Sequence, residues 1–147
     1  KTKFNGSVQI AVGSNAPHLA SLKKTFSNYL FNIELFENVT GIYELISKAD
    51  LVIGGGGVSL LERMSLGKPS ITFVVSKNQE QQVNWAASLG ATVSLNLNNE
   101  LMEKDVAKVI NLLLLDVQFR KRMSEISINL VDGKGALRVS KELALTK

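Results

Sequence analysis

The sequence predicts an α/β domain built on a doubly wound parallel β-sheet, with helices on both faces and a helical C-terminus. Short apolar segments rich in β-branched residues alternate with segments of helical periodicity as far as residue 95. Three helical patterns without a strand between them occupy the rest of the chain. Strands separated by single helices imply right-handed crossovers, which give parallel pairing and cover both faces of the sheet.

The elements are marked by their composition and by their end signals. Segment 7–12 alternates like a strand, Pro17 starts a helix and Thr40 is a candidate N-cap. Gly67 and Gly90 stop the helices that precede them. The expected strands are residues 7–12, 33–36, 51–53, 70–75 and 92–95. The expected helices are residues 17–28, 41–48, 58–66, 79–89, 104–115, 117–130 and 136–145.

Composition limits the class of protein. A chain of 147 residues, 45% of them apolar, is long enough for one domain with a core and too short for two. It has no cysteine and one histidine, so we expect no disulfide, no metal site and no cofactor. No apolar run approaches the roughly 20 residues of a membrane span, and no secretory leader is present, so we expect a cytoplasmic protein. The net charge of +4 is scattered, which favours a solvated surface over a nucleic-acid interface.

The most informative stretch is the run of four glycines at residues 54–57. It follows an apolar segment that ends at Ile53 and precedes a helix that begins at Val58. Such a junction brings backbone N–H groups to the positive end of a helix dipole, which suits a phosphate or diphosphate. The expected ligand-binding groups are those of Gly55, Gly56, Gly57, Val58 and Ser59.

The glycine run also has a purely structural interpretation. A tight strand-to-helix turn uses glycine too, although four in a row exceed what a turn requires. The run lacks the Gly-Lys-Ser/Thr ending of a P-loop and the GxGxxG spacing of NAD sites. Ligands of parallel α/β sheets bind beyond the carboxyl ends of the strands, so we expect the turns at residues 13–15, 54–57 and 76–79 to share one rim.

Polar residues near this loop suggest a nucleotide-sugar ligand. The carboxylate of Glu62, one turn into the helix, can accept two hydrogen bonds from ribose hydroxyls, but it could also be a surface carboxylate. Asn78 and Gln79 follow the next strand, and amides match sugar hydroxyls and acetamido groups. From spacing alone, an N-cap at Asn78 with a polar helix start accounts for the same residues equally well.

Two further residues have simple structural roles. His18 has no evident carboxylate or serine partner and is typical of a capping or surface residue. Lys134 could reach an anionic ligand, although its segment DGKG (132–135) is typical of a loop or cap between two helices. We therefore name no catalytic residue.

Three segments carry a resemblance to a known family: GSNAPH (13–18), ADLVIGGGGVSLLERMSLGKPSITFVVSKNQEQQ (49–82) and LVDGKGALRV (130–139). They resemble the C-terminal half of the UDP-sugar hydrolases of pseudaminic acid biosynthesis, a group that includes spore-coat polysaccharide proteins. More distantly, the core is similar to the C-terminal domain of the family 28 glycosyltransferases that add N-acetylglucosamine to lipid-linked peptidoglycan precursors. Both groups have the two-domain GT-B architecture, whose C-terminal domain is Rossmann-like.

The resemblance implies roles for individual residues. Gly56, Gly57 and Ser59 would hold the diphosphate and Glu62 the ribose hydroxyls, while Asn78 and Gln79 would face the sugar. In that family an N-terminal domain supplies the catalytic histidine, and His18 aligns with a different segment and does not inherit that role.

The resemblance also implies a strand that this chain lacks. In these domains a strand in the middle of the sheet precedes the segment that begins here at Ser7, and residues 1–6 are too short and polar to supply it. We expect a five-stranded remnant whose centre is filled by a partner chain or by rearranged neighbours.

Together, these features indicate one expected function and two alternatives. The chain, residues 1–147, would be a single nucleotide-sugar-binding domain, the C-terminal half of a longer UDP-sugar hydrolase, inactive without its N-terminal catalytic domain. It would bind UDP or a UDP-sugar in nonulosonic acid and surface polysaccharide biosynthesis. The alternatives are the donor-binding half of a GT-B glycosyltransferase and a non-catalytic subunit of a two-chain enzyme.

Overall fold

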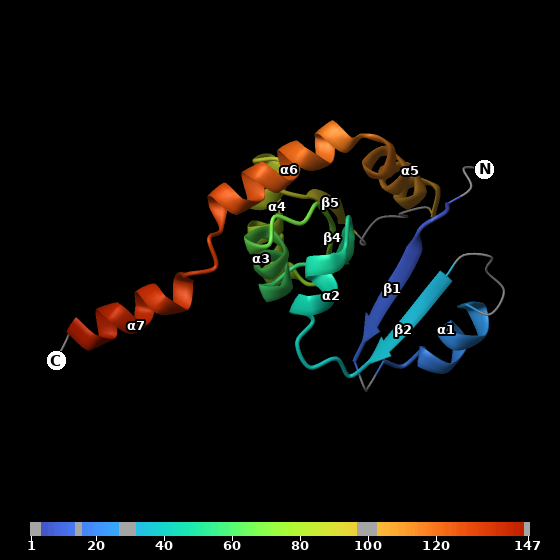
Figure 1. Cartoon of the computed structure of the whole chain (residues 1–147), viewed down its shortest axis with the longest axis horizontal. Coiled ribbons are helices and arrows are strands. Elements are labelled where there is room, and N and C mark those ends of the chain that lie inside the picture. Colours follow the sequence, from blue (N-terminus) through green and yellow to red (C-terminus); the bar gives the residue numbers. More distant parts are fainter. Residues whose placement is uncertain (1–3, 14–15, 27–31, 97–102, 146–147) are drawn as a thin grey trace. The chain divides into compact units, whose positions relative to one another are not determined.

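The computed structural model describes residues 4–13, 16–26, 32–96 and 103–145, and it divides the chain into two compact units (Figure 1). The first unit is Lys1–Leu45 and the second is Ile46–Lys147. The boundary falls inside the short helix α2 (Tyr43–Lys48). The expectation that the whole chain forms one domain stays a prediction.

The first unit is a β-α-β arrangement. Strand β1 (Ser7–Val12) pairs in parallel with β2 (Asn32–Glu37), and helix α1 (Leu19–Phe26) connects them. In β1 exposed and half-buried residues alternate, as expected for a strand with one covered face. The prediction of both strands is confirmed, whereas the expected end of the first helix at residue 28 lies outside the described residues.

The second unit holds the glycine run and a three-stranded parallel sheet in the order β3-β4-β5. The strands are β3 (Val52–Gly55), β4 (Ser70–Val74) and β5 (Val93–Asn96). The helices are α3 (Val58–Ser65), α4 (Glu80–Ser88), α5 (Glu103–Leu115), α6 (Val117–Leu130) and α7 (Gly135–Leu145), with a 3₁₀ turn η1 (Lys77–Gln79) before α4. Every strand and helix predicted here is present, with ends that differ from the prediction by at most two residues.

Helices cover both faces of this sheet, and the central strand β4 is therefore buried on both sides. On one face Val74 packs with Leu60 and Met64 of α3 and with Val83 and Ala86 of α4. Ile71 points to the opposite face. There it packs with side chains of α5 and α6, led by Leu113 and Met123. The predicted doubly wound arrangement is confirmed.

Glycines with positive φ determine where α3 and α4 end and why α2 begins later in the sequence than predicted. Gly67 (φ 61°) and Gly90 (φ 81°) follow α3 and α4 in the left-handed conformation that stops a helix, as predicted. Helix α2 was expected to begin at Gly41, but Gly41 has φ 89° and cannot be helical. The helix therefore begins two residues later, at Tyr43.

The described residues contain the five expected strands, but these form two sheets. Strands β1 and β2 pair only with each other, and β3, β4 and β5 form the second sheet. Strand β3 is an edge of its sheet. The proposed means of completing the sheet, by a partner chain or by rearranged neighbours, stays a prediction.

Candidate functional site

The glycine run lies where β3 ends and α3 begins. Strand β3 continues two residues further than predicted, so that Gly54 and Gly55 pair with β4. The N–H of Gly56 donates to the carbonyl of Phe73 at 2.9 Å, which extends this pairing by one more residue. Gly57 then takes φ 86° and forms the N-cap of α3. Only glycine adopts this conformation without strain, so the sequence here dictates an abrupt turn into the helix.

The N-terminus of α3 provides the donors for an anion. The first N–H groups of a helix have no partner within it, and they carry the positive end of the helix dipole. The N–H of Leu60 already reaches the carbonyl of Gly57 at 3.1 Å. Because the N–H of Gly56 is bonded to Phe73, the groups left for a ligand are those of Gly57, Val58 and Ser59. The role of Gly56 as a donor stays a prediction, and its place in the structure indicates a packing role instead.

Close packing explains why a glycine occupies position 56. A Cβ at this position would lie 2.6 Å from Cγ2 of Val83 and 3.0 Å from Oε1 of Gln79. Val83 is fully buried in the core and cannot retreat. At Gly55, by contrast, a Cβ would meet only Val75, at an ordinary 3.6 Å. The packing that requires glycine at position 56 is therefore absent at position 55.

The hydroxyl of Ser59 faces the interior. Its Oγ donates to the carbonyl of Gly55 at 3.4 Å and accepts from Nη1 of Arg63 at 3.2 Å. The expected contact of Ser59 with a diphosphate is therefore best provided by its backbone N–H. This contact stays a prediction.

The structure brings Gln79 to the glycine run and leaves Asn78 further out. The side chain of Gln79 packs beneath Gly56 and Gly57, and its Oε1 accepts from the N–H of Val75 at 3.4 Å. Asn78 is exposed and accepts a hydrogen bond from the hydroxyl of Ser76. The two loops that follow β3 and β4 thus share one rim, as predicted. The third expected loop follows β1 in the other unit, and its Ser14 and Asn15 lie outside the described residues.

Glu62 lines a cavity of about 450 Å³ beside α3. Helix α3 contributes Val58, Leu61, Glu62 and Ser65 to this cavity, four residues that share one face of the helix. The opposite wall is formed by the end of α6, the segment that joins α6 to α7 and the start of α7, with Leu130, Val131, Asp132, Gly133, Gly135, Ala136 and Arg138. Val58, the first residue of α3, and Glu62 therefore line one common space, whose volume is typical of small-molecule sites.

The wall opposite Glu62 is held by an ion pair. The guanidinium of Arg138 binds both carboxylate oxygens of Asp132, and the N–H of Lys134 donates to Oδ1 at 3.0 Å. The backbone hydrogen bond and Arg138 lower the pKa of Asp132 below its ordinary value. The DGKG segment was predicted to be a loop or cap, and the structure places it against the candidate site, where a Cβ on Gly133 would lie 3.6 Å from Ser65.

Two of these features have almost no signal in the local sequence. Arg63 is next to Glu62 in a helix, and its charge suggests a solvated position, but it is only 2% exposed. The loop at Asp132 is far from Glu62 in sequence, and only the packing of α6 on α3 brings them together. The only sequence signals were the Ser59–Arg63 spacing of four residues, which places both on one helix face, and the glycines of DGKG.

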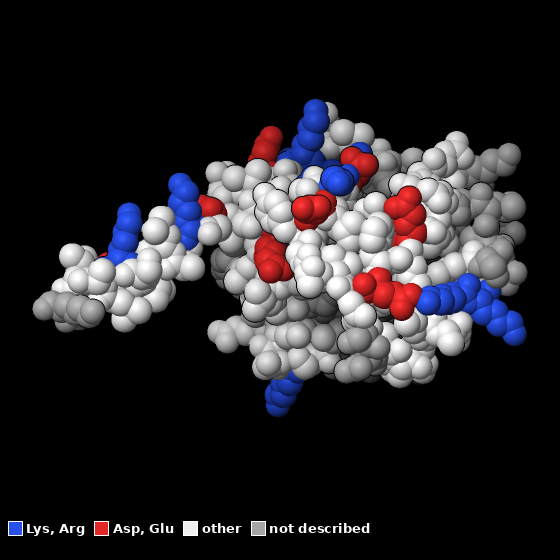
Figure 2. Space-filling view, turned by 60° about the horizontal axis from the view of Figure 1, so that its bottom comes forward, with Lys and Arg blue, Asp and Glu red and all other residues white. Residues whose placement is uncertain are grey.

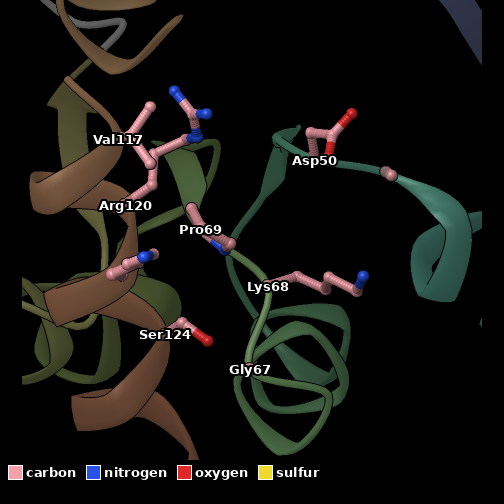
Figure 3. Close-up of a pocket in the computed structure, with 9 residues that line it drawn as sticks. Asp50, Gly67, Lys68, Pro69, Val117, Arg120 and Ser124 are labelled. Atoms are coloured by element: carbon pink, nitrogen blue, oxygen red, sulfur yellow. The ribbon is translucent and has the colours of Figure 1, made fainter. Parts of the chain in front are cut away.

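A second hollow, of about 230 Å³, lies near the starts of β3 and β4 (Figure 3). Its lining includes Asp50, Lys68 and Arg120. Figure 3 shows the side chains of Lys68 and Arg120 extending in different directions. Nη1 of Arg120 donates to the carbonyls of Leu113 and Leu114, so this cation caps the end of α5. The hollow is at the amino ends of the strands, opposite to the edge where parallel sheets bind ligands.

Three observations concern other kinds of site. Among the described residues, no cluster of three or more His, Cys, Asp or Glu side chains is placed to hold a metal ion. No helix in the described ranges has both the length and the apolar character needed to cross a membrane. Figure 2 shows Lys and Arg interspersed with Asp and Glu on the face in view, without one continuous basic patch.

Comparison with known proteins places this chain in a family. The glycosyltransferase family 28 C-terminal domain matches residues 1–142. The spore coat polysaccharide biosynthesis protein SpsG of Bacillus subtilis is 23% identical over 133 residues, which are 90% of this chain and 39% of SpsG. This chain thus spans well under half the length of that relative.

Solved structures share the fold. MurG of Acinetobacter baumannii superimposes with a TM-score of 0.76 at 14% identity, over 93% of this chain and 40% of MurG. The spinosyn rhamnosyltransferase SpnG superimposes with a TM-score of 0.72 at 23% identity, over 96% of this chain and 37% of SpnG. Such low identities establish the Rossmann-like GT-B C-terminal fold and nothing finer. Because the family match extends over nearly the whole sequence, the chain belongs to the glycosyltransferase family 28 C-terminal domain family.

Proposed function

We propose that this chain binds a UDP-sugar as the nucleotide-binding half of a UDP-sugar hydrolase in surface polysaccharide biosynthesis. The observation that carries the proposal is that Glu62 and Val58, the first residue of α3, line one cavity of about 450 Å³. The family, whose C-terminal domains typically bind a nucleotide-sugar donor, supports the ligand class. The likeness to a spore coat polysaccharide biosynthesis protein supports the biosynthetic role.

The binding geometry follows from the donors and acceptors of the rim. The diphosphate lies at the N–H groups of Gly57, Val58 and Ser59, where the helix dipole stabilises negative charge. The carboxylate of Glu62, one turn further along the same helix, accepts hydrogen bonds from the two ribose hydroxyls. Bidentate recognition of this kind selects a ribonucleotide over its 2′-deoxy analogue.

The sugar extends toward the loop after β4. The exposed amide of Asn78 is free to turn from Ser76 to a sugar hydroxyl or acetamido group. Gln79 supports the glycine run from below and reaches the same ligand from the side of Gly57. The substrate is a UDP-linked diacetamido-trideoxy-hexose on the route to a pseudaminic-type acid, and its hydrolysis requires an N-terminal domain with the catalytic histidine.

A glycosyltransferase half is the second candidate, and the family match favours it directly. Both candidates use the same donor site and differ in the acceptor, which is water in one case and an alcohol in the other. Joining the chain to its N-terminal domain and measuring UDP release with and without candidate acceptors separates them. A third candidate, a non-catalytic subunit, predicts that a separate catalytic polypeptide co-purifies with this chain.

The proposed ribose contact is tested by calorimetry with UDP and 2′-deoxy-UDP. Glu62→Ala should weaken UDP binding about 10- to 100-fold, because two hydrogen bonds to a charged group are lost. It should affect 2′-deoxy-UDP much less. The control is Glu125→Ala, which removes an exposed carboxylate of α6 outside the cavity and should leave both affinities unchanged. Unchanged UDP affinity in Glu62→Ala would show that the assignment is wrong.

A further inference from the structure

Arg63 is a buried cation beside the glycine run. It is 2% exposed and lies on α3 between Glu62, which faces the cavity, and Met64, which is in the core. Within the part of the chain that the structure describes, no carboxylate forms an ion pair with it. Charged side chains are almost never fully buried unless they are paired, so the burial of this charge indicates a specific role.

The guanidinium of Arg63 lies directly behind the glycine run. Nη2 donates to the carbonyl of Gly55 at 3.0 Å, and Nη1 donates to Oγ of Ser59 at 3.2 Å. A Cβ on Gly54 would lie only 3.1 Å from Nη1. Nε is buried and has no hydrogen-bond partner among the described residues. The charge is therefore close to the loop and only partly satisfied by it.

A buried network of hydroxyl groups fixes this guanidinium on the sheet. Nη2 also donates to Oγ1 of Thr72 at 3.1 Å. Since that oxygen accepts from Arg63, its own proton is free to go to Oγ1 of Thr92 at 2.7 Å. Thr92 in turn donates to the carbonyl of Ser70 at 2.8 Å. Besides its bonds to Gly55 and Ser59, Arg63 is thus also held by Thr72 of β4, which lies outside the glycine run.

This arrangement affects the charge that a ligand meets at the rim. Both polar groups of the Gly55–Gly56 peptide are bonded to protein, the carbonyl to Arg63 and the N–H to Phe73. The carbonyl oxygen, which would repel an anion, is thereby turned inward and neutralised. The N–H groups of the next residues are left at the helix start, with a full positive charge behind them.

We propose that Arg63 is a positioning residue for the diphosphate, which holds the glycine run from behind and supplies a buried positive charge that attracts the ligand without touching it. This inference rests on the proposed function, because it assigns the counter-charge of Arg63 to the diphosphate of the nucleotide. Burial lowers the pKa of Arg63 from its ordinary value to about 10, with the nearby Glu62 acting in the opposite direction. The side chain is therefore still cationic at neutral pH.

The test compares UDP with uridine in Arg63→Met and Arg63→Lys. Methionine has a similar length and no charge, so Arg63→Met should weaken UDP binding about tenfold and change uridine binding less than about twofold. The slope of UDP affinity against salt concentration should also become smaller. Arg63→Lys retains the charge and should bind UDP within about threefold of the wild type. The control Lys121→Met removes one exposed charge of α6, remote from the loop, and should have no effect.

The outcomes separate this inference from the proposed function. Equal losses for UDP and uridine in Arg63→Met would mean a purely structural role and would overturn the proposal, as would unchanged UDP binding. If Arg63→Met does not fold, a folded Arg63→Lys that loses UDP affinity tenfold overturns it, since the charge is then not what matters. If the wild type does not bind UDP at all, the proposed function itself fails.

Discussion

The packing of the glycine run makes a specific prediction for Gly56→Ala. The new methyl group would lie 2.6 Å from Cγ2 of Val83 and 3.0 Å from Oε1 of Gln79, both much closer than van der Waals contact. Val83 is fully buried against Leu60 and Met64, so the loop must move instead. The displaced segment includes the start of α3, which is the proposed diphosphate site.

The expected loss of stability is that of an overpacked core. Inserting a methyl group into a well-packed interior costs about 2 kcal/mol. For a chain of this size that corresponds to a melting temperature lower by about 4 to 8 °C. The matched variant Gly55→Ala meets only Val75 at 3.6 Å and should be neutral or slightly stabilising, because alanine restricts the unfolded chain.

Thermal unfolding followed by circular dichroism measures both variants, and calorimetry with UDP measures the second consequence. Gly56→Ala should melt lower and bind UDP more weakly, while Gly55→Ala should retain both properties. If the two variants melted at the same temperature, the packing role of Gly56 would be refuted.

Three further predictions concern other residues. Asn78→Ala should weaken binding of UDP-N-acetylglucosamine more than binding of UDP in calorimetry, and equal losses would reject its sugar contact. Thr92→Val should lower the free energy of unfolding, measured by urea denaturation, by about 1 to 3 kcal/mol, because the buried polar groups of Ser70 and Thr72 on β4 lose their partner. The exposed control Thr25→Val should change this free energy little. Equal effects of the two substitutions would contradict the buried hydroxyl network. An NMR titration should show a lowered pKa, below 3.8, for the carboxyl of Asp132, so its contribution to stability is present at higher pH and is lost as the pH falls through that lowered pKa. Arg138→Gln should raise this pKa. A pKa above 3.8 in the wild type would contradict the ion pair.

Local patterns in the sequence predict the elements and the place of the site. The stops at Gly67 and Gly90 are correct because a positive φ at glycine is a local property, and so is the junction from β3 into α3. The rim formed by the loops after β3 and β4 follows from parallel pairing alone. These features depend on a few neighbouring residues and on the rules of α/β folds.

Features that depend on distant contacts could not be predicted. The buried Arg63 is bonded to the hydroxyl of Thr72 on β4, which in turn bonds to Thr92 just before β5. Nothing in the sequence near residue 63 indicates these partners. The hydrogen bond from the Gly56 N–H to Phe73 depends on the register of β3 against β4. A run of glycines has no side-chain pattern from which that register could be predicted. The far wall of the cavity, at Asp132, is placed by the packing of α6 on α3.

The central claim is that UDP binds between the start of α3 and the loop at Asp132, and an NMR titration of the isotope-labelled chain with UDP tests it most directly. We expect the amide signals of Gly57, Val58, Ser59 and Gly133 to shift with a common affinity, while those of Gly67 and Lys68 beside the second hollow do not. Shifts confined to the second hollow, or no shifts at millimolar UDP, would contradict it.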